Sequence, residues 1–241
     1  MGEVIVVASG KDGVGKTVVV TNLGAGLAQN GYSVVLLDMN IGSRNLDMRM
    51  GLEDRVVYDV ADIIAGVCRI KKAMIKDERF ENLYLISAPQ RKDKAVITTA
   101  QLSALCRELK RVFDYIIIDA PAGAGHDFLL AASPADRAVL VTIPEYAAIR
   151  DSELINAMLK KAGISRRSVI VNMILPDLHN TKLVPDPEEI SESLRLPVDG
   201  LIPYDRNIHI SANMGIPIVA IENNYIAENM KGIAERIASK N

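Results

Sequence analysis

The sequence is poor in the residues that most often hold metals or form disulfides. Its 241 residues include no tryptophan, two cysteines and three histidines, and aromatic residues make up only 4%. Cys68 and Cys106 lie far apart and neither belongs to a C-x-x-C spacing, so we expect inert thiols in a reducing cytoplasm. The histidines are scattered and form no metal-ligand spacing. The sequence therefore gives no sign of a disulfide framework or of a cysteine or histidine metal site.

The sequence also lacks long apolar runs, a signal peptide and an excess of charge of one sign. Its longest apolar runs have the length of strands, which is too short for a transmembrane helix. The first eight residues carry no basic region such as a signal peptide has. The formal net charge of -2 leaves no general nucleic-acid footprint. We therefore expect a cytoplasmic protein, and the composition argues against nucleic acid as a partner.

Residues 10–17, in contrast, form a complete phosphate-binding loop. Gly10, Gly15, Lys16 and Thr17 satisfy the pattern G-x-x-x-x-G-K-[ST]. A β-branched run precedes the loop and a segment with helical spacing follows it, which is the context that the motif requires. Backbone N–H groups of such a loop wrap a phosphate, and the helix N-terminus adds positive potential. We expect Lys16 to reach the β- and γ-phosphates of ATP or ADP and Thr17 to ligate Mg²⁺. The predicted nucleotide-binding residues of the loop are Gly10, Lys11, Asp12, Gly13, Val14, Gly15, Lys16, Thr17 and Val18.

Short apolar runs alternate with helical segments along the whole chain. This alternation predicts a doubly wound α/β fold, a mostly parallel β-sheet with helices on both faces. The predicted strands are Val4–Ala8, Ser33–Leu37, Leu83–Ser87, Tyr115–Asp119, Ala138–Thr142, Ser168–Asn172 and Gly200–Pro203. The predicted helices are Thr17–Gln29, Tyr58–Ala65, Thr99–Arg111, Asp127–Ser133, Asp151–Ala162, Pro187–Leu194 and Ala227–Ala238. No linker, repeat or low-complexity segment interrupts the pattern, so residues 1–241 are expected to form a single domain.

Polar residues that follow the strands are the candidate site, because ligands of such sheets lie beyond the carboxyl ends of the strands. Asp119 follows the apolar run at 115–118, as a Walker B aspartate does, and is expected to bind a water of Mg²⁺. Asp38 ends the second predicted strand and is a further candidate carboxylate for Mg²⁺. Gly123 follows Asp119 by four residues, a position suited to sensing the γ-phosphate through its backbone N–H.

Several motifs together resemble the MinD/ParA family of dimeric ATPases. The loop carries an extra lysine, Lys11, like the deviant phosphate loop K-G-G-V-G-K-T of that family. The similarity to its MinD branch runs from Glu3 to about Ile237. Its segments are Gly-Ser-Arg-Asn-Leu-Asp (42–47), Val-Val-Tyr-Asp-Val (56–60), Asp-Ala-Pro-Ala-Gly (119–123), Pro-Glu (144–145) and Arg-Asp-Ser (150–152). The resemblance implies a P-loop NTPase of the SIMIBI type that hydrolyses ATP to ADP and phosphate, slowly without an activating partner.

The resemblance also implies roles for residues outside the loop. In the family, the extra lysine crosses a dimer interface to the partner's nucleotide, which implies a homodimer in the ATP state. Glu145 and Asp151 would support the dimer face and Lys11. Asn172 and the segment Pro203–Asp205, with Pro203 and Asp205 as binding residues, would lie near the adenine. The implied catalytic residues are Lys11, Lys16, Asp38 and Asn40, and the implied metal-binding residues are Thr17, Asp38 and Asp119.

Partners are likewise implied by the resemblance alone. They are MinC-like and MinE-like regulators of division-site placement, together with the inner face of the cell membrane. Relatives reach the membrane through a short basic amphipathic helix, and the sequence ends at Asn241 before such a segment. The stripe Met230, Ile233, Ala234, Ile237 and Ala238 is expected to be the core face of a final helix instead. Membrane association therefore requires a helix beyond Asn241.

Three residues depart from the family pattern. Asp12 stands where the family has glycine, Val18 where a second Thr or Ser bonds the α-phosphate, and Asn40 where an aspartate orients the attacking water. An amide takes no proton from water, and loss of such a group costs about 10²–10⁴ in rate. Asp12 would repel phosphate by on the order of 4 kcal/mol at about 4 Å, unless it pairs with Lys11 or points to solvent. We expect nucleotide binding to survive and hydrolysis to be weakened.

Alternatives from other classes remain open at this point. A ParA-type DNA-partition ATPase would need a basic dimer surface, of which the composition gives no sign. An iron–sulfur carrier of the same superfamily would need clustered cysteines at a dimer axis, which Cys68 and Cys106 do not match. A FlhG-like placement ATPase and a non-hydrolysing nucleotide-dependent scaffold also remain. Measuring ATP turnover together with nucleotide-dependent mass addresses these alternatives.

Overall fold

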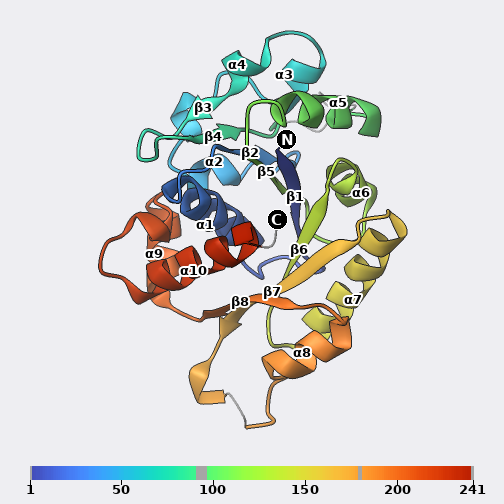
Figure 1. The fold of residues 1–241 in the computed structure, drawn as a ribbon, viewed down its shortest axis with the longest axis vertical. Helices are drawn as coiled ribbons and strands as arrows, with labels where there is room; N and C mark the ends of the chain where they lie inside the picture. Colours follow the sequence, from blue (N-terminus) through green and yellow to red (C-terminus); the bar gives the residue numbers. More distant parts are fainter. Residues whose placement is uncertain (1, 91–96, 179–180, 240–241) are drawn as a thin grey trace.

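An eight-stranded sheet runs through the centre of the computed structural model, which describes residues 2–90, 97–178 and 181–239 (Figure 1). The strand order is β3-β4-β2-β5-β1-β6-β7-β8, and only the pair of β3 and β4 is antiparallel. The predicted doubly wound, mostly parallel sheet is thereby confirmed. The strands are β1 (Glu3–Ala8), β2 (Val34–Asp38), β3 (Ile75–Lys76), β4 (Leu83–Ile86), β5 (Tyr115–Asp119), β6 (Arg137–Thr142), β7 (Arg166–Ile174) and β8 (Val198–Pro203).

Helices cover both faces of this sheet (Figure 1). One face packs against α1 and α10, and the other packs mainly against α5, α6, α7 and α8. The α-helices are α1 (Lys16–Gln29), α2 (Leu46–Arg49), α3 (Val60–Ile64), α4 (Ile70–Ala73), α5 (Thr99–Leu109), α6 (His126–Ala132), α7 (Tyr146–Lys161), α8 (Pro187–Leu194), α9 (Arg206–Asn213) and α10 (Tyr225–Ser239). In the described part of the chain, the connections contain the 3₁₀ helices η1 (Glu53–Arg55), η3 (Pro176–Leu178) and η4 (Ile218–Ala220).

Burial on two faces explains why the central strands read as continuous apolar runs. All of β2 and β5 is buried, as is β1 after Glu3, and the side chains of each strand alternate between the two core clusters. The predicted apolar stripe of the final helix is also confirmed. Its members Met230, Ile233, Ala234 and Ile237 are buried against the α1 side of the sheet.

The structure differs from the prediction where elements are short or poorly buried. Strand β3 has only two residues, and α2 and α4 have four each, too few to establish a periodicity. Helix α9 fully buries only Ser211, so no apolar stripe announces it. Helix α7 begins at Tyr146 rather than at Asp151, because Ala148 and Ile149 already pack against the core.

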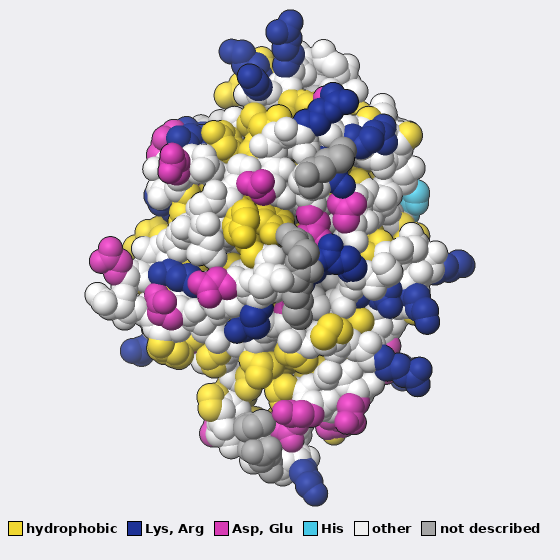
Figure 2. All heavy atoms as spheres, viewed as in Figure 1, with side chains coloured by type: hydrophobic (Ala, Val, Ile, Leu, Met, Phe, Trp, Pro, Cys, Tyr) yellow, Lys and Arg dark blue, Asp and Glu magenta, His cyan; other side chains and the backbone are white. Residues whose placement is uncertain are grey.

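The surface carries both signs of charge. Figure 2 shows basic and acidic side chains interspersed over most of the face that it presents, which agrees with the small net charge of -2. Among the described residues, no helix has both the length and the apolar composition needed to span a bilayer.

Burial raises the pKa of the Cys106 thiol to about 12, so this cysteine is inert at neutral pH, as expected.

A buried ion pair ties the last helix to the sheet. The Arg137 guanidinium at the start of β6 donates to the Asp199 carboxylate of β8 and to the Ile237 carbonyl of α10, each at 2.8 Å. Both side chains of the pair are almost fully buried, at 3% and 0% exposed. Removing one partner of such a pair leaves an uncompensated charge in the interior.

We therefore expect Arg137→Met to lower the free energy of unfolding by about 3–5 kcal/mol, because the Asp199 carboxylate loses its buried cation. Urea unfolding followed by circular dichroism measures this change. The matched control is Arg111→Met, just after the end of α5, because the ion pair of Arg111 with Glu108 is largely exposed and should contribute at most about 1 kcal/mol. Equal losses in the two variants would contradict the role of the buried pair.

Candidate functional site

The predicted phosphate loop lies between β1 and α1. Residues of α7 and β7 approach it closely. A Cβ atom at Gly10 would lie 2.4 Å from the backbone carbonyl carbon of Asp151 on α7. Gly15 has a φ of 88°, and a Cβ atom there would lie 2.2 Å from Nδ2 of Asn172. That amide donates a 2.8 Å hydrogen bond to the Val14 carbonyl. The loop therefore requires glycine at these two positions, and the hydrogen bond from Asn172 attaches it to β7.

Asp119, a predicted metal-binding residue, is the centre of a cluster of predicted site residues. Its carboxylate is fully buried at the end of β5 and accepts from the Lys16 ammonium. It also accepts from the Thr17 hydroxyl at 2.8 Å and from the Asn40 amide at 2.9 Å. Three residues, two from the first turn of α1 and one from the segment after β2, thus converge on one carboxylate.

Asp38 lies directly beside this cluster, because Asp38 and Asp119 are partners in the register of β2 and β5. Its carboxylate accepts from the backbone N–H of Asn40 at 2.8 Å and of Leu46 at 3.3 Å. Burial, and then the neighbouring Asp119 carboxylate, raise the pKa of Asp38 to about 7. Two adjacent buried carboxylates favour a cation, so Asp38, Asp119 and Thr17 have the oxygen chemistry that suits Mg²⁺. Within the described residues, no group of three or more His, Cys, Asp or Glu offers another metal site.

A cleft of about 270 Å³ opens above the cluster. Most predicted binding residues line it, namely Lys11, Asp12, Gly13, Val14, Gly15, Lys16, Thr17, Val18, Asn40, Asn172, Pro203 and Asp205. The prediction missed other lining residues, which are Ser9, Ser43, Asn45, Arg49, Met173, Ile208, His209 and Ala212. Three of these belong to α9, whose existence the apolar pattern did not reveal. The Tyr204 and His209 rings, 5.8 Å apart, form an aromatic part of this wall.

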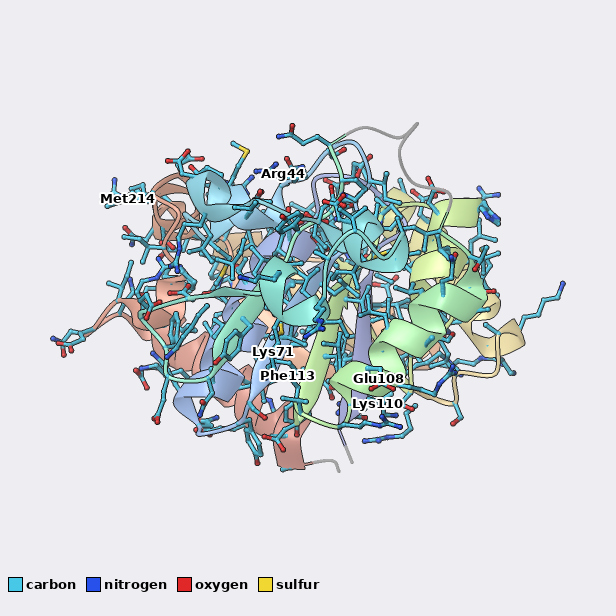
Figure 3. The ribbon with its side chains drawn as sticks, turned by 90° about the horizontal axis from the view of Figure 1, so that it is seen from above. Arg44, Lys71, Glu108, Lys110, Phe113 and Met214 are labelled. Atoms are coloured by element: carbon cyan, nitrogen blue, oxygen red, sulfur yellow. The ribbon has the colours of Figure 1, made fainter. Side chains whose placement is uncertain are left out.

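The cleft lies at the carboxyl edge of the sheet. In Figure 3, Arg44, which follows β2, and Met214, which follows α9, lie toward one edge of the molecule. Lys110 and Phe113, which precede β5, lie toward the opposite edge. The lining residues Asn40, Asn172 and Pro203 lie at or just after the carboxyl ends of β2, β7 and β8, so the cleft opens at this edge.

The remaining predicted residues lie at the rim or beside it. The Lys11 ammonium pairs with the Glu145 carboxylate at 2.7 Å, and these side chains are 43% and 53% exposed. Asp12 is exposed, so of its two expected arrangements the structure adopts the one that faces solvent. Asp151 is also exposed, on α7 beside Gly10. The Gly123 N–H donates to the Ser9 carbonyl at 3.0 Å, which places the segment after Asp119 against the start of the loop.

Comparisons with known proteins find similar proteins over nearly the whole chain. Residues 1–238 match the ParA family, which is described as "NUBPL iron-transfer P-loop NTPase". The septum site-determining protein MinD of Synechocystis sp. is 44% identical over 222 residues, covering 92% of this chain and 84% of that protein. A chain of the Aquifex aeolicus MinC:MinD cell division protein complex superposes with a TM-score of 0.92 at 36% identity, covering 100% of this chain and 97% of the other. The MinD of Pyrococcus horikoshii OT3 complexed with Mg-ADP gives a TM-score of 0.89 at 28% identity, covering 98% and 96%.

We expect Asn172→Ala to weaken ADP binding by about 5- to 30-fold, because the buried bond that holds the Val14 carbonyl is lost. Isothermal titration calorimetry with Mg-ADP measures the change. Asn156→Ala is the matched control, since Asn156 also donates to a backbone carbonyl, that of Leu194 at 2.9 Å, but does not line the cleft. If both variants bind ADP like the wild type, Asn172 does not support the loop.

Proposed function

The chain belongs to the ParA family of P-loop NTPases, in its MinD branch, and from this premise we propose that ATP switches it into a dimer that recruits partner proteins. As a MinD-type ATPase it acts in division-site placement. One observation carries the proposal for the switch. Lys16, Thr17 and two buried carboxylates converge beneath one cleft, and the family's extra lysine, Lys11, stands at the rim of that cleft.

The residues of the cluster have distinct tasks in binding Mg-ATP. The metal of the substrate complex neutralises phosphate charge, and Thr17, Asp38 and Asp119 would hold it with oxygen atoms. Backbone N–H groups of Gly13–Thr17 would surround the phosphates. The Lys16 ammonium would exchange its contact with Asp119 for the β- and γ-phosphates, since an ammonium binds phosphate as a point charge. Asn172 and the wall of Pro203–Asp205 would lie against the adenine.

Dimerisation is proposed to depend on Lys11. The side chain is half exposed, and its partner in this chain, Glu145, directly precedes α7 with an extended backbone. The γ-phosphate of a second copy would supply a doubly charged acceptor that competes for the same ammonium. Such a contact differs between ATP and ADP, which is what any nucleotide-driven population shift requires.

Partners and location follow from the family. The Aquifex aeolicus relative is found in a MinC:MinD complex, so we propose a MinC-like partner for this chain, and a MinE-like regulator by resemblance. We propose that the ATP-bound dimer acts in the cytoplasm at the inner face of the membrane.

We expect a slowly hydrolysed ATP analogue to double the mass of the wild type, and ADP to leave it monomeric. Lys11→Ala should remain monomeric with both nucleotides, because the contact to the partner's phosphate is lost. Light scattering coupled to size-exclusion chromatography measures this difference. Lys72→Ala on α4, an exposed lysine outside the cleft, is the control and should dimerise normally. A wild type that stays monomeric under every condition would leave Lys11 as a surface residue.

Hydrolysis is proposed to be limited by residue 40. Asn40→Asp should raise ATP turnover by about 10²-fold at saturating Mg-ATP and leave ATP affinity nearly unchanged, because the group acts mainly in the transition state. Adding Asp12→Gly should raise turnover further if Asp12 repels the phosphates. Phosphate release assays, with and without a MinE-like activator, measure both effects. Asn213→Asp, at an exposed position outside the cleft, is the control. No change of turnover in Asn40→Asp under either condition would refute the water-positioning role.

A further inference from the structure

The side-chain amide of Asn40 lies between the two buried carboxylates of the site. Its Nδ2 atom is 3.2 Å from Oδ1 of Asp38 and 2.9 Å from Oδ2 of Asp119. The backbone N–H of Asn40 adds a 2.8 Å bond to the same Asp38 oxygen. One residue therefore donates to both carboxylates and bridges the ends of β2 and β5.

The orientation of this amide is fixed by its neighbours. Both nearby oxygens belong to carboxylates, which accept hydrogen bonds and offer no donor when ionised. The NH₂ group, with its two donors, is the end of the amide that satisfies two acceptors at once. Its oxygen would be repelled by the same pair of carboxylates. The amide thus presents the positive end of its dipole to both negative charges.

Charge makes this bridge specific to an amide. Asp38 and Asp119 are both fully buried. Among the described residues, Lys16 is the positively charged side chain that contacts this pair, through its ion pair with Asp119. When both carboxyl groups are ionised, two carboxylates and one ammonium leave one excess negative charge in the cluster. A carboxylate at position 40 would leave two, and it would stand within hydrogen-bond distance of both aspartates without a proton to donate. Like charges at this separation in a buried site repel strongly.

We propose that Asn40 is a positioning residue that substitutes for part of the charge of a metal ion. It holds Asp38 and Asp119 in place when Mg²⁺ is not bound. This role deepens the proposed function. It rests on that function in one respect, namely that Asp38 and Asp119 are the carboxylates that bind Mg²⁺. It is separate from the action of residue 40 on water. A consequence is that the wild type should keep its thermal stability in the absence of divalent cations, whereas the thermal stability of variants at position 40 should depend on these cations.

Thermal unfolding without nucleotide tests this proposal. In EDTA, Asn40→Asp should melt about 5–10 °C below the wild type, because a third carboxylate joins the buried pair. Asn40→Ala, which removes the donors without adding charge, should show a smaller loss of about 2–5 °C. Millimolar MgCl₂ alone should restore most of the loss in both variants and shift the wild type by about 1 °C at most. Asn213→Asp, at an exposed position at the end of α9 that does not line the cleft, should melt like the wild type with and without MgCl₂.

Two results would overturn the proposal. One is that both variants at position 40 melt with the wild type in EDTA. The other is that MgCl₂ raises the melting temperature of the wild type and of all three variants by the same amount. A merely structural role of Asn40 would give this result, because it would not make stability depend on the cation. If Asn40→Asp does not fold, the comparison of Asn40→Ala with the wild type decides. The melts require neither turnover nor dimer formation, so a failure of the ATP switch would not affect them.

Discussion

The buried carboxylate of Asp119 is the group on which the geometry of the site depends. An ionised carboxylate in the interior is unfavourable unless donors surround it, and here donors come from Lys16, Thr17 and Asn40. The phosphate loop, the first turn of α1 and the segment after β2 are therefore drawn to one point. A phosphate that attracts the Lys16 ammonium removes a counter-charge from Asp119. Phosphate binding and cation binding at this site are consequently linked, because the cation must replace what the lysine supplied.

The parallel sheet supplies the second constraint. Asp38 and Asp119 meet because β2 and β5 are in register at their carboxyl ends. β1 lies between β5 and β6, so the loop that follows it opens at the same edge. From β7, Asn172 reaches back to the loop and occupies the space that a side chain at Gly15 would need. The sheet thus brings together residues that lie more than 150 positions apart in the sequence, and hydrogen bonds between them fix the loop.

The sequence predicted most of the fold because buried parallel strands are continuous apolar runs, as Tyr115–Asp119 illustrates. It predicted Lys16 and Thr17 from the phosphate-loop motif and Asp119 from the apolar run that precedes it, because both patterns restrict the residue types that can follow. It did not predict α9, which buries little, and so it missed Ile208 and His209 in the wall of the cleft. Nor did spacing indicate the pairing of Lys11 with Glu145 within one chain or the bridge from Asn40 to two aspartates. Such contacts depend on side-chain directions at the ends of separate strands, about which a linear pattern carries no information.

The three departures from the family pattern differ in physical weight. Asp12 is exposed, so solvent screens its charge and its repulsion of phosphate falls well below the value for a buried group. Val18 lacks a hydroxyl but lies outside the charged cluster, and it removes one hydrogen bond to a ligand at most. Asn40 is different because it contacts both buried carboxylates. At that position a carboxylate would stabilise the transition state of hydrolysis but would add to the repulsion within the cluster. An amide reduces the repulsion but does not accept a proton from the attacking water. We infer that the identity of residue 40 sets a balance between turnover and the stability of the metal-free site, an instance of the general conflict between function and stability.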